Sequence, residues 1–196
     1  MIDLKAIAVF CGSSEGNDTE IISQAEILGH TLAKKEITLV YGAAKIGIMG
    51  KVAQGVLDNH GKVIGVIPEF LKLKEVVHLG LSQLITTSNM HERKLKMHEL
   101  SNGFITLPGG YGTFEELFEI MTWAQLGLHQ KPIGLLNING FYDDLIKMLD
   151  RMVVNGFLKL INLDLLIVED DIDILLDKMR HYKPQDVPKW LKANRT

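Results

Sequence analysis

The sequence predicts an α/β protein built on a doubly wound parallel sheet within a single domain. Short apolar runs rich in β-branched residues alternate with longer amphipathic stretches along the 196 residues, a pattern typical of βαβ units. The runs are apolar throughout rather than at every second residue, which indicates strands covered by helices on both faces. Right-handed crossovers then give a doubly wound, Rossmann-like sheet, in which ligands bind beyond the carboxyl ends of the strands.

Seven segments have the composition of buried strands, and most of them end at glycine, proline or serine residues that indicate a turn. In chain order they are Lys5–Phe10, Ile37–Tyr41, Lys62–Ile67, Leu81–Thr86, Gly103–Leu107, Pro132–Leu136 and Leu165–Val168. The carboxyl-end rule selects five loops as candidate site segments. They follow Phe10, Tyr41, Ile67, Thr86 and Leu107.

Between the strands, apolar residues recur at spacings of three and four, the period of an amphipathic helix. The predicted helices are Asn17–Lys35, Gly47–Asn59, one capped by Ser88 or Asn89 that runs to Leu100, Tyr111–Leu126, Phe141–Val154, and one capped by Asp170 or Asp171 that runs to about Tyr182. No linker, repeat or low-complexity segment interrupts this order. We therefore expect one domain over residues 1–182 and a polar tail over residues 183–196.

Composition narrows the partners and cofactors that we expect. With 21 basic and 24 acidic residues the net charge is −3, so the chain lacks the positive field that nucleic-acid binding needs. A single cysteine excludes an internal disulfide and a cysteine-based zinc site, and His91-Glu92 has no second histidine four residues on, so we expect no metal and no cofactor. Without a signal-peptide pattern or an 18-residue apolar stretch, we expect a cytoplasmic protein that binds no membrane.

The segment Pro108–Thr113 joins a predicted strand to a predicted helix and holds three glycines. Glycines let the backbone adopt positive φ and approach a ligand closely. The helix N-terminus would then offer free N–H groups and a partial positive charge, which suit a phosphate. The segment is neither a dinucleotide fingerprint, because Glu115 replaces the third glycine, nor a P-loop, because no Gly-Lys-Ser/Thr follows.

Two interpretations of Glu116 fit the spacing. With Thr113 as N-cap, Glu116 would be the third helical residue of a capping box. Alternatively, Glu116 is a catalytic carboxylate beside the phosphate cradle. Two carboxylates there, Glu115 and Glu116, would repel a phosphate unless they serve another purpose.

Arg93 also has two interpretations. It shares a helix face with Met90 and Met97, so its stem could be buried while its guanidinium enters the crevice. The alternative is a solvated, salt-bridging face, because Glu92 and Lys96 are four residues apart. The glycine-rich segments Gly42–Gly50 and Gly12–Ser14 are similarly either ligand loops or tight turns.

Together these segments resemble the Lonely-guy (LOG) family of phosphoribohydrolases, which release a free cytokinin base from its riboside 5′-monophosphate. The resemblance extends over about residues 5–182. It rests on Met90-His-Glu-Arg-Lys94, Pro108-Gly-Gly-Tyr-Gly-Thr-Phe-Glu-Glu116, Thr122-Trp-Ala-Gln125, Gly42–Gly50, Cys11–Ser14 and Lys131–Asn137. No lysine lies in a context that suits pyridoxal phosphate, so we expect no lysine decarboxylase activity.

The resemblance implies a homodimeric hydrolase that cleaves the N-glycosidic bond of adenine-type riboside 5′-monophosphates, cytokinin nucleotides and AMP among them. It implies that Arg93 and Glu116 are the catalytic pair. It implies substrate contacts from Glu75, Lys94, Gly110, Tyr111, Gly112, Thr113, Glu115 and Thr122. Further substrate-binding candidates in the same segments are Gly12, Ser13, Gly47, Met49, Gly50, Met90, Pro108 and Gly109.

One position departs from the family pattern, since Ala43 stands where the family usually has a second glycine. Two other functions also remain open. A non-catalytic nucleotide or molybdenum-cofactor carrier on the same fold is the first, and the presence of both Arg93 and Glu116 argues against it. A nucleic-acid-binding module is the second, and the net negative charge argues against that.

Overall fold

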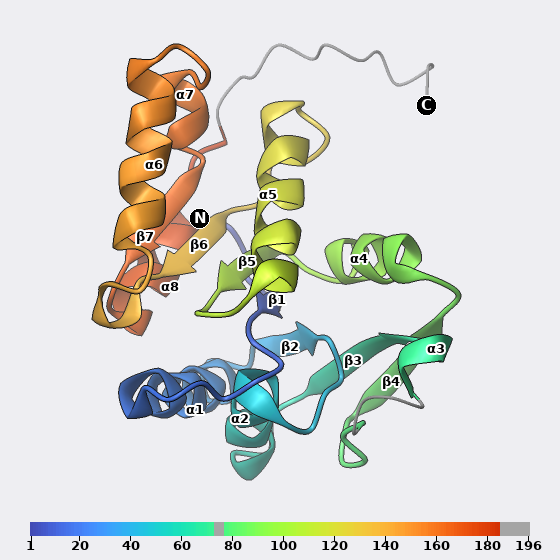
Figure 1. Ribbon diagram of the computed structural model, residues 1–196. Helices are drawn as coiled ribbons and strands as arrows, with labels where there is room; N and C mark the ends of the chain where they lie inside the picture. The colour runs from blue at the N-terminus through green and yellow to red at the C-terminus, as the bar shows by residue number, and fades with distance from the viewer. Residues whose placement is uncertain (73–76, 185–196) are drawn as a thin grey trace.

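The computed structural model describes residues 1–72 and 77–184, and its centre is a seven-stranded sheet (Figure 1). All neighbouring strands are parallel, in the order β4-β3-β2-β1-β5-β6-β7. The strands are β1 (Ala6–Phe10), β2 (Thr38–Tyr41), β3 (Val63–Pro68), β4 (Gln83–Thr87), β5 (Gly103–Thr106), β6 (Ile133–Leu136) and β7 (Leu166–Glu169). The predicted fold class is confirmed, and every predicted strand is present with ends shifted by at most two residues.

The order of the strands creates a switch point between β1 and β5. From β1 the chain builds outward through β2 and β3 to β4, then returns to the other side of β1 and continues outward from β5. Hydrogen bonds extend this pairing past the strand ends: the Leu107 N–H donates to the Phe10 carbonyl (2.9 Å) and the Gly12 N–H to the Pro108 carbonyl (3.1 Å). The loops after β1 and β5 therefore lie side by side where such folds bind ligands.

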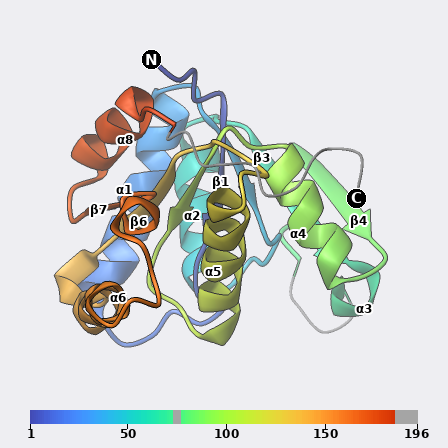
Figure 2. The same cartoon turned by 90° about the horizontal axis from the view of Figure 1, so that it is seen from above.

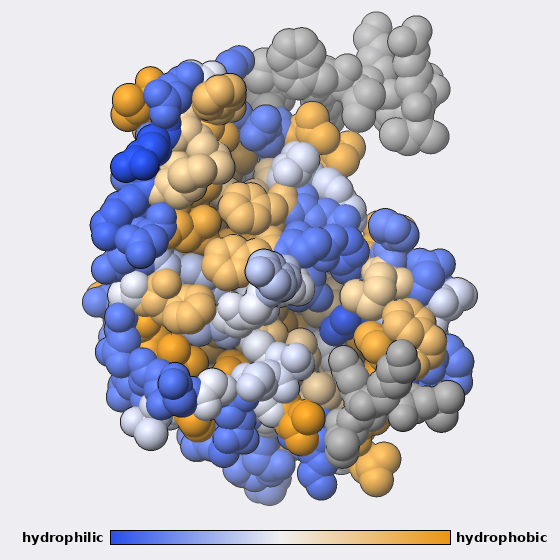
Figure 3. Space-filling view, viewed as in Figure 1, coloured by the Kyte–Doolittle hydropathy of each residue, from blue (hydrophilic) through white to orange (hydrophobic). Residues whose placement is uncertain are grey.

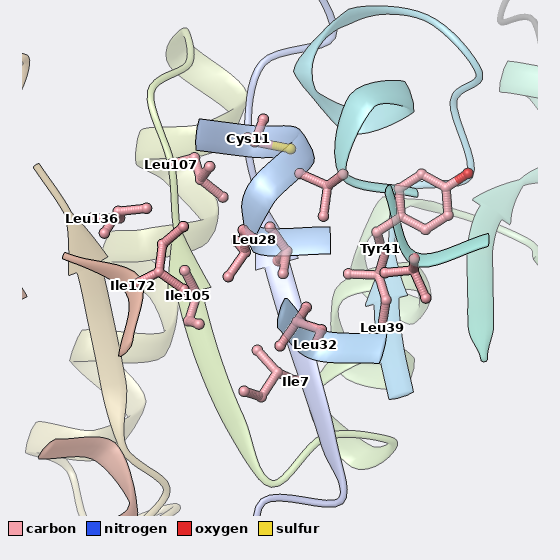
Figure 4. Close-up of a cluster of buried hydrophobic side chains, with 14 of the residues drawn as sticks. Ile7, Cys11, Leu28, Leu32, Leu39, Tyr41, Ile105, Leu107, Leu136 and Ile172 are labelled. Atoms are coloured by element: carbon pink, nitrogen blue, oxygen red, sulfur yellow. The ribbon is translucent and has the colours of Figure 1, made fainter. Parts of the chain in front are cut away.

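Helices cover both faces of the sheet, as the apolar strands predict (Figure 2). The long helices are α1 (Thr19–Lys34), α2 (Gly47–Asp58), α4 (Met90–Glu99), α5 (Tyr111–Gln125), α6 (Asp143–Val154) and α8 (Ile172–His181). Successive residues of a strand point to opposite faces, so Ile7 of β1 packs in one layer with α1, α2 and α8, whereas Ala8 packs in the other with α4, α5 and α6. Figure 4 shows the first of these layers, with Leu28 and Leu32 of α1 close to the sheet.

Three of these helices begin at a capping side chain that accepts a hydrogen bond from the first turn. Asp18 accepts from the Glu20 N–H (2.9 Å), Asn89 from the Glu92 N–H (2.9 Å) and Asp171 from the Ile174 N–H (2.8 Å). Two candidate caps were predicted for each of α4 and α8. In both helices the second candidate is the cap, Asn89 in α4 and Asp171 in α8.

Three short helical segments were not predicted. They are α3 (Glu69–Lys72), α7 (Leu160–Leu163) and the 3₁₀ turn η1 (Ile138–Gly140). Segments of three or four residues are shorter than the repeat on which a periodicity argument rests. The predicted tail falls mostly on residues 185–196, which lie outside the described residues. In the described part of the chain, no helix is both long and apolar enough to cross a membrane.

Candidate active site

A cavity of about 300 Å³ lies beyond the carboxyl ends of five neighbouring strands. Each loop selected by the carboxyl-end rule leads to a segment that lines this cavity. The lining residues are Cys11, Gly12 and Ser13 after β1, Met49 of α2, Leu71 of α3, Met90 and Arg93 of α4, and Gly110, Tyr111, Gly112, Thr113, Glu115 and Glu116 at the start of α5.

The guanidinium of Arg93 lies in this cavity and not on a solvated helix face. Only 6% of the residue is exposed. Its Nε donates to the Val66 carbonyl of β3 (3.2 Å), and its Nη1 lies 3.8 Å from the Met90 sulfur. The salt-bridging interpretation is therefore wrong for Arg93, because its side chain is buried and bonds the Val66 carbonyl, while half-buried Lys96 pairs with Glu99 instead.

Glu116 lines the cavity from the second turn of α5 and is not a cap of this helix. The helix starts at Tyr111 with Gly110 as N-cap, so Thr113 is the third helical residue rather than the cap. The capping-box interpretation is wrong because the helix begins three residues earlier than that motif requires. With 6% of Glu116 exposed, its carboxyl is buried beside the pocket.

Burial raises the pKa of Glu116 from 4.5 to about 7, while the charges of Arg93 and Lys94 lower it and those of Glu115 and Glu119 raise it. Desolvation is the largest of these effects, because burial removes the water that solvates the ionised carboxylate. Among the described residues, no direct ion pair joins Glu116 to Arg93. The cavity is therefore lined by the permanently charged guanidinium of Arg93 and by the carboxyl of Glu116. The carboxyl does not pair with the guanidinium, and it gains and loses its proton near neutral pH.

Lys94 lies behind the cavity wall and neutralises the carboxylates of α5. Its Nζ is 2.5 Å from an oxygen of Glu115 and 3.0 Å from an oxygen of Glu119. Burial alone would lower the pKa of Lys94, but these two hydrogen bonds raise it. The expected repulsion between two carboxylates and a phosphate is thus weakened, since Glu115 is paired and Glu116 is protonated for part of the time.

The N-terminus of α5 is open toward the cavity. Among the described residues, no side chain caps it, whereas α1, α4 and α8 have caps. The first intrahelical hydrogen bond runs from the Phe114 N–H to the Gly110 carbonyl, so the N–H groups of residues 111–113 point out of the helix. These donors and the helix dipole favour an anion in the cavity.

One of the two roles predicted for the glycines of this segment is absent. None of the three adopts positive φ, so the conformational reason was wrong: the turn is made with ordinary extended and helical backbone. A Cβ at Gly109 would lie 2.1 Å from the Thr113 hydroxyl, so this glycine makes room for Thr113. A Cβ at Gly110 or Gly112 would meet no protein atom within 4 Å.

The second glycine-rich segment is mostly scaffold. Gly47 has φ +71°, and a Cβ there would lie 2.3 Å from the Ser13 backbone. The Met49 N–H donates to the Gly12 carbonyl (3.2 Å), so the loop after β1 occupies this helix N-terminus. Met49 lines the cavity, but neither Gly47 nor Gly50 does.

Comparison with known proteins identifies the family. A family model described as "Possible lysine decarboxylase" matches residues 49–179. The cytokinin riboside 5′-monophosphate phosphoribohydrolase LOG2 of Arabidopsis thaliana is 43% identical over 181 residues, which are 92% of this chain and 85% of the relative. A relative from Oryza sativa subsp. japonica, named a probable enzyme of the same activity, is 44% identical over 92% of this chain and 85% of its own length. The chain belongs to the LOG family.

Solved structures share the fold of this LOG family member. A molybdenum cofactor binding protein from Rippkaea orientalis superposes with a TM-score of 0.68 over 92% of this chain and 98% of that one. A second solved structure, that of TM1055, superposes with a TM-score of 0.69 over 91% of this chain and 99% of that one. Their identities are 19% and 22%, so the likeness shows the fold alone.

The remaining predicted site residues either do not line this cavity or fall outside the described residues. Thr122 is exposed further along α5, and its hydroxyl donates to the Phe118 carbonyl (2.7 Å). Pro108 and Gly109 line a neighbouring cavity of about 460 Å³. Glu75 falls on residues 73–76, outside the described residues.

Two lining residues were missed by the sequence analysis. Cys11 is the first residue after β1, and burial, followed by the charge of Glu116, raises the pKa of its thiol. Its place at the end of a central strand was a signal that could have found it. Leu71 lies on α3, a helix too short to be predicted. Within the described ranges, no group of three or more His, Cys, Asp or Glu residues could hold a metal ion.

The raised pKa of Glu116 predicts a pH-dependent stability that Glu116→Gln removes. The folded pKa of about 7 exceeds the unfolded value of about 4.3, so the folded state binds the proton more tightly. The contribution is fully present below the unfolded pKa and is lost as pH rises through the folded one. From about pH 5 to about pH 8, the unfolding free energy of the wild type should therefore fall by about 2–3 kcal/mol more than that of Glu116→Gln.

Urea unfolding of both proteins at the two pH values measures this difference. The matched control is Glu99→Gln, a carboxylate of α4 whose side chain is 50% exposed and whose charge is not among those that shift the pKa of Glu116, so it should keep the pH dependence of the wild type. An unchanged pH dependence in Glu116→Gln would show that Glu116 is ionised throughout.

Proposed function

We propose that this protein hydrolyses the N-glycosidic bond of adenine-type riboside 5′-monophosphates, cytokinin nucleotides and AMP among them, to free base and ribose 5-phosphate. The observation that carries the proposal is the separation of Arg93 and Glu116, two buried groups that line one cavity without an ion pair. The activity in the names of the relatives from Arabidopsis and rice supports it.

In this proposal the start of α5 holds the 5′-phosphate. The N–H groups of residues 111–113 lack partners within the helix, and Gly110 and Gly112 leave open space where a side chain would stand. A phosphate clamped there fixes the ribose relative to Glu116 in the next turn. Orientation of this kind lowers the barrier by placing the reacting atoms in advance.

Glu116 acts at the sugar. Cleavage passes through an oxocarbenium-like ribose, which a nearby carboxylate stabilises, and the same carboxylate takes a proton from the attacking water. A carboxyl with a pKa of about 7 matches neutral conditions, because both the accepting and the donating forms are populated. Acid–base action of this kind is worth about 10²–10⁴-fold in rate.

Arg93 supplies the positive charge. The cation offsets the negative charge on the departing base or holds the phosphate, and kinetics distinguish the two roles. Loss of a group that acts only on the leaving base lowers kcat, whereas loss of uniform phosphate binding raises KM. Arg93→Ala separates these outcomes.

We also propose that the chain forms a homodimer. Large apolar side chains stay exposed on and beside the helices of the site: Leu95 is 48% exposed, Tyr111 97% and Leu128 50%. Figure 3 shows that hydrophobic patches interrupt the hydrophilic surface of this face. A two-fold interface buries such patches between identical surfaces. Exposed Thr122 would contact substrate only if the complete site extends beyond this cavity.

The phosphate cradle predicts strict selection for the monophosphate. AMP and N6-isopentenyl-AMP should yield free base, and adenosine should yield at least about 10²-fold less, because it lacks the group that orients the sugar. Chromatography of the bases and of ribose 5-phosphate measures this. Equal turnover of adenosine and AMP would contradict the cradle, and tight AMP binding without any turnover would favour a nucleotide carrier.

Glu116→Gln should lower kcat by about 10²–10⁴-fold while AMP still binds, because the amide neither carries charge nor takes a proton. Glu119→Gln is the matched control, since Glu119 shares the helix and the Lys94 contact without lining the cavity. Initial rates and AMP titrations of both variants provide the test. Full activity of Glu116→Gln would leave the reaction without its proposed base.

The homodimer predicts a sedimentation mass of about twice 21.9 kDa at micromolar concentration, because two identical apolar surfaces cover one another. Leu95→Glu, which charges the exposed side of α4, should shift the protein toward monomer. Ile27→Glu is the control, an exposed apolar position of α1 away from the site helices. A monomeric wild type would refute the proposal.

A further inference from the structure

Gly42, directly after β2, is the residue of the second glycine-rich segment that touches the catalytic cation. A Cβ at this position would lie 2.1 Å from Nη2 and 3.3 Å from Cζ of Arg93, and 3.0 Å from the Met49 sulfur. Such distances are far inside van der Waals contact, so the guanidinium occupies the space that any side chain at position 42 would need.

Backbone conformation does not explain this glycine. Gly42 is absent from the residues with positive φ, so its backbone suits any L-residue. The next residue has the opposite mismatch: Ala43 has φ +68°, the left-handed region that favours glycine. A glycine placed for the turn alone would stand at position 43.

We infer that Gly42 is a positioning residue for Arg93: it provides the empty volume in which the guanidinium is held against the cavity. Three sides of the guanidinium are then defined. Nε donates to the Val66 carbonyl, Nη1 faces the Met90 sulfur, and Nη2 rests against Gly42. The atoms nearest to the missing side chain are ends of flexible side chains and not backbone, so Gly42→Ala moves the guanidinium and leaves the strand in place.

Displacement of the guanidinium has an electrostatic consequence at Glu116. The charge of Arg93 is the largest influence that favours the ionised carboxylate, so its withdrawal raises the pKa of Glu116. An opposite charge within about 4–6 Å shifts a carboxyl by about 1–3 units, and partial withdrawal should give a rise of about one unit. The titratable or charged groups around this carboxyl are Arg93, Lys94, Glu115, Glu119 and Cys11.

The first test is a ¹³C NMR titration of the Glu116 carboxyl, assigned through its loss in Glu116→Gln. We expect the pKa to rise by about one unit in Gly42→Ala. In an Arg93→Ala background, Gly42→Ala should cause no further rise, because no guanidinium is left to displace. This readout does not depend on turnover, so it tests the inference even if the proposed hydrolysis proves wrong.

The second test is kinetic, and its expectation rests on the proposed function. Gly42→Ala should lower kcat/KM for AMP by about 10²-fold, the cost of a misplaced catalytic group, and shift the acid limb of the pH–rate profile upward. Gly103→Ala is the matched control. A Cβ at Gly103 would also meet only side-chain atoms, at 3.1–3.3 Å, and Gly103 begins β5, at the end of the strand that faces away from the cavity.

Folding gives a third outcome. If Gly42→Ala fails to fold but folds together with Arg93→Ala, the steric conflict with the guanidinium is demonstrated directly. If neither protein folds, Gly42 serves the backbone and the inference is overturned. It is equally overturned if Gly42→Ala leaves both the Glu116 titration and kcat/KM unchanged, or if the pKa of Glu116 rises equally in the Arg93→Ala background.

Discussion

The structure depends on a buried cation and a buried carboxyl that share one cavity without touching. Moving an unpaired charge out of water costs several kcal/mol, and a direct Arg93–Glu116 ion pair would offset more of that cost than their separation does. The chain instead holds the guanidinium with the Val66 carbonyl and relieves the carboxyl through a pKa of about 7. The separation lowers stability and leaves both groups available to a ligand.

The sheet brings these groups together, and this part could be predicted from the sequence. In a parallel sheet the carboxyl ends of all strands lie at one edge, so the motifs around Arg93 and Glu116 were bound to lie at that edge, while the strand order decides how near to each other they are. The order itself, with β1 beside β5, is not written in apolar periodicity. It explains why the loops after Phe10 and Leu107 are joined by hydrogen bonds and form the floor of the site.

What the sequence left open or misassigned has particular physical causes. A capping box and one face of a helix both place residues three apart, so Thr113 and Glu116 fitted two structures until the helix start at Tyr111 excluded one. The burial of Arg93 could not be predicted either, since an amphipathic pattern does not show whether a neighbouring strand covers that face of the helix. Leu71 was missed because one turn of helix carries no period.

The glycines show most clearly where sequence reasoning ends. A glycine serves a backbone conformation, a protein contact or a ligand contact, and one letter stands for all three. The structure assigns Gly47 to the first through its positive φ and Gly109 to the second through Thr113. Gly112 has neither reason, although a glycine within a helix costs about 0.5–1 kcal/mol relative to alanine. That cost, set beside an uncapped helix N-terminus and open space, supports the proposal that a ligand approaches Gly112 closely.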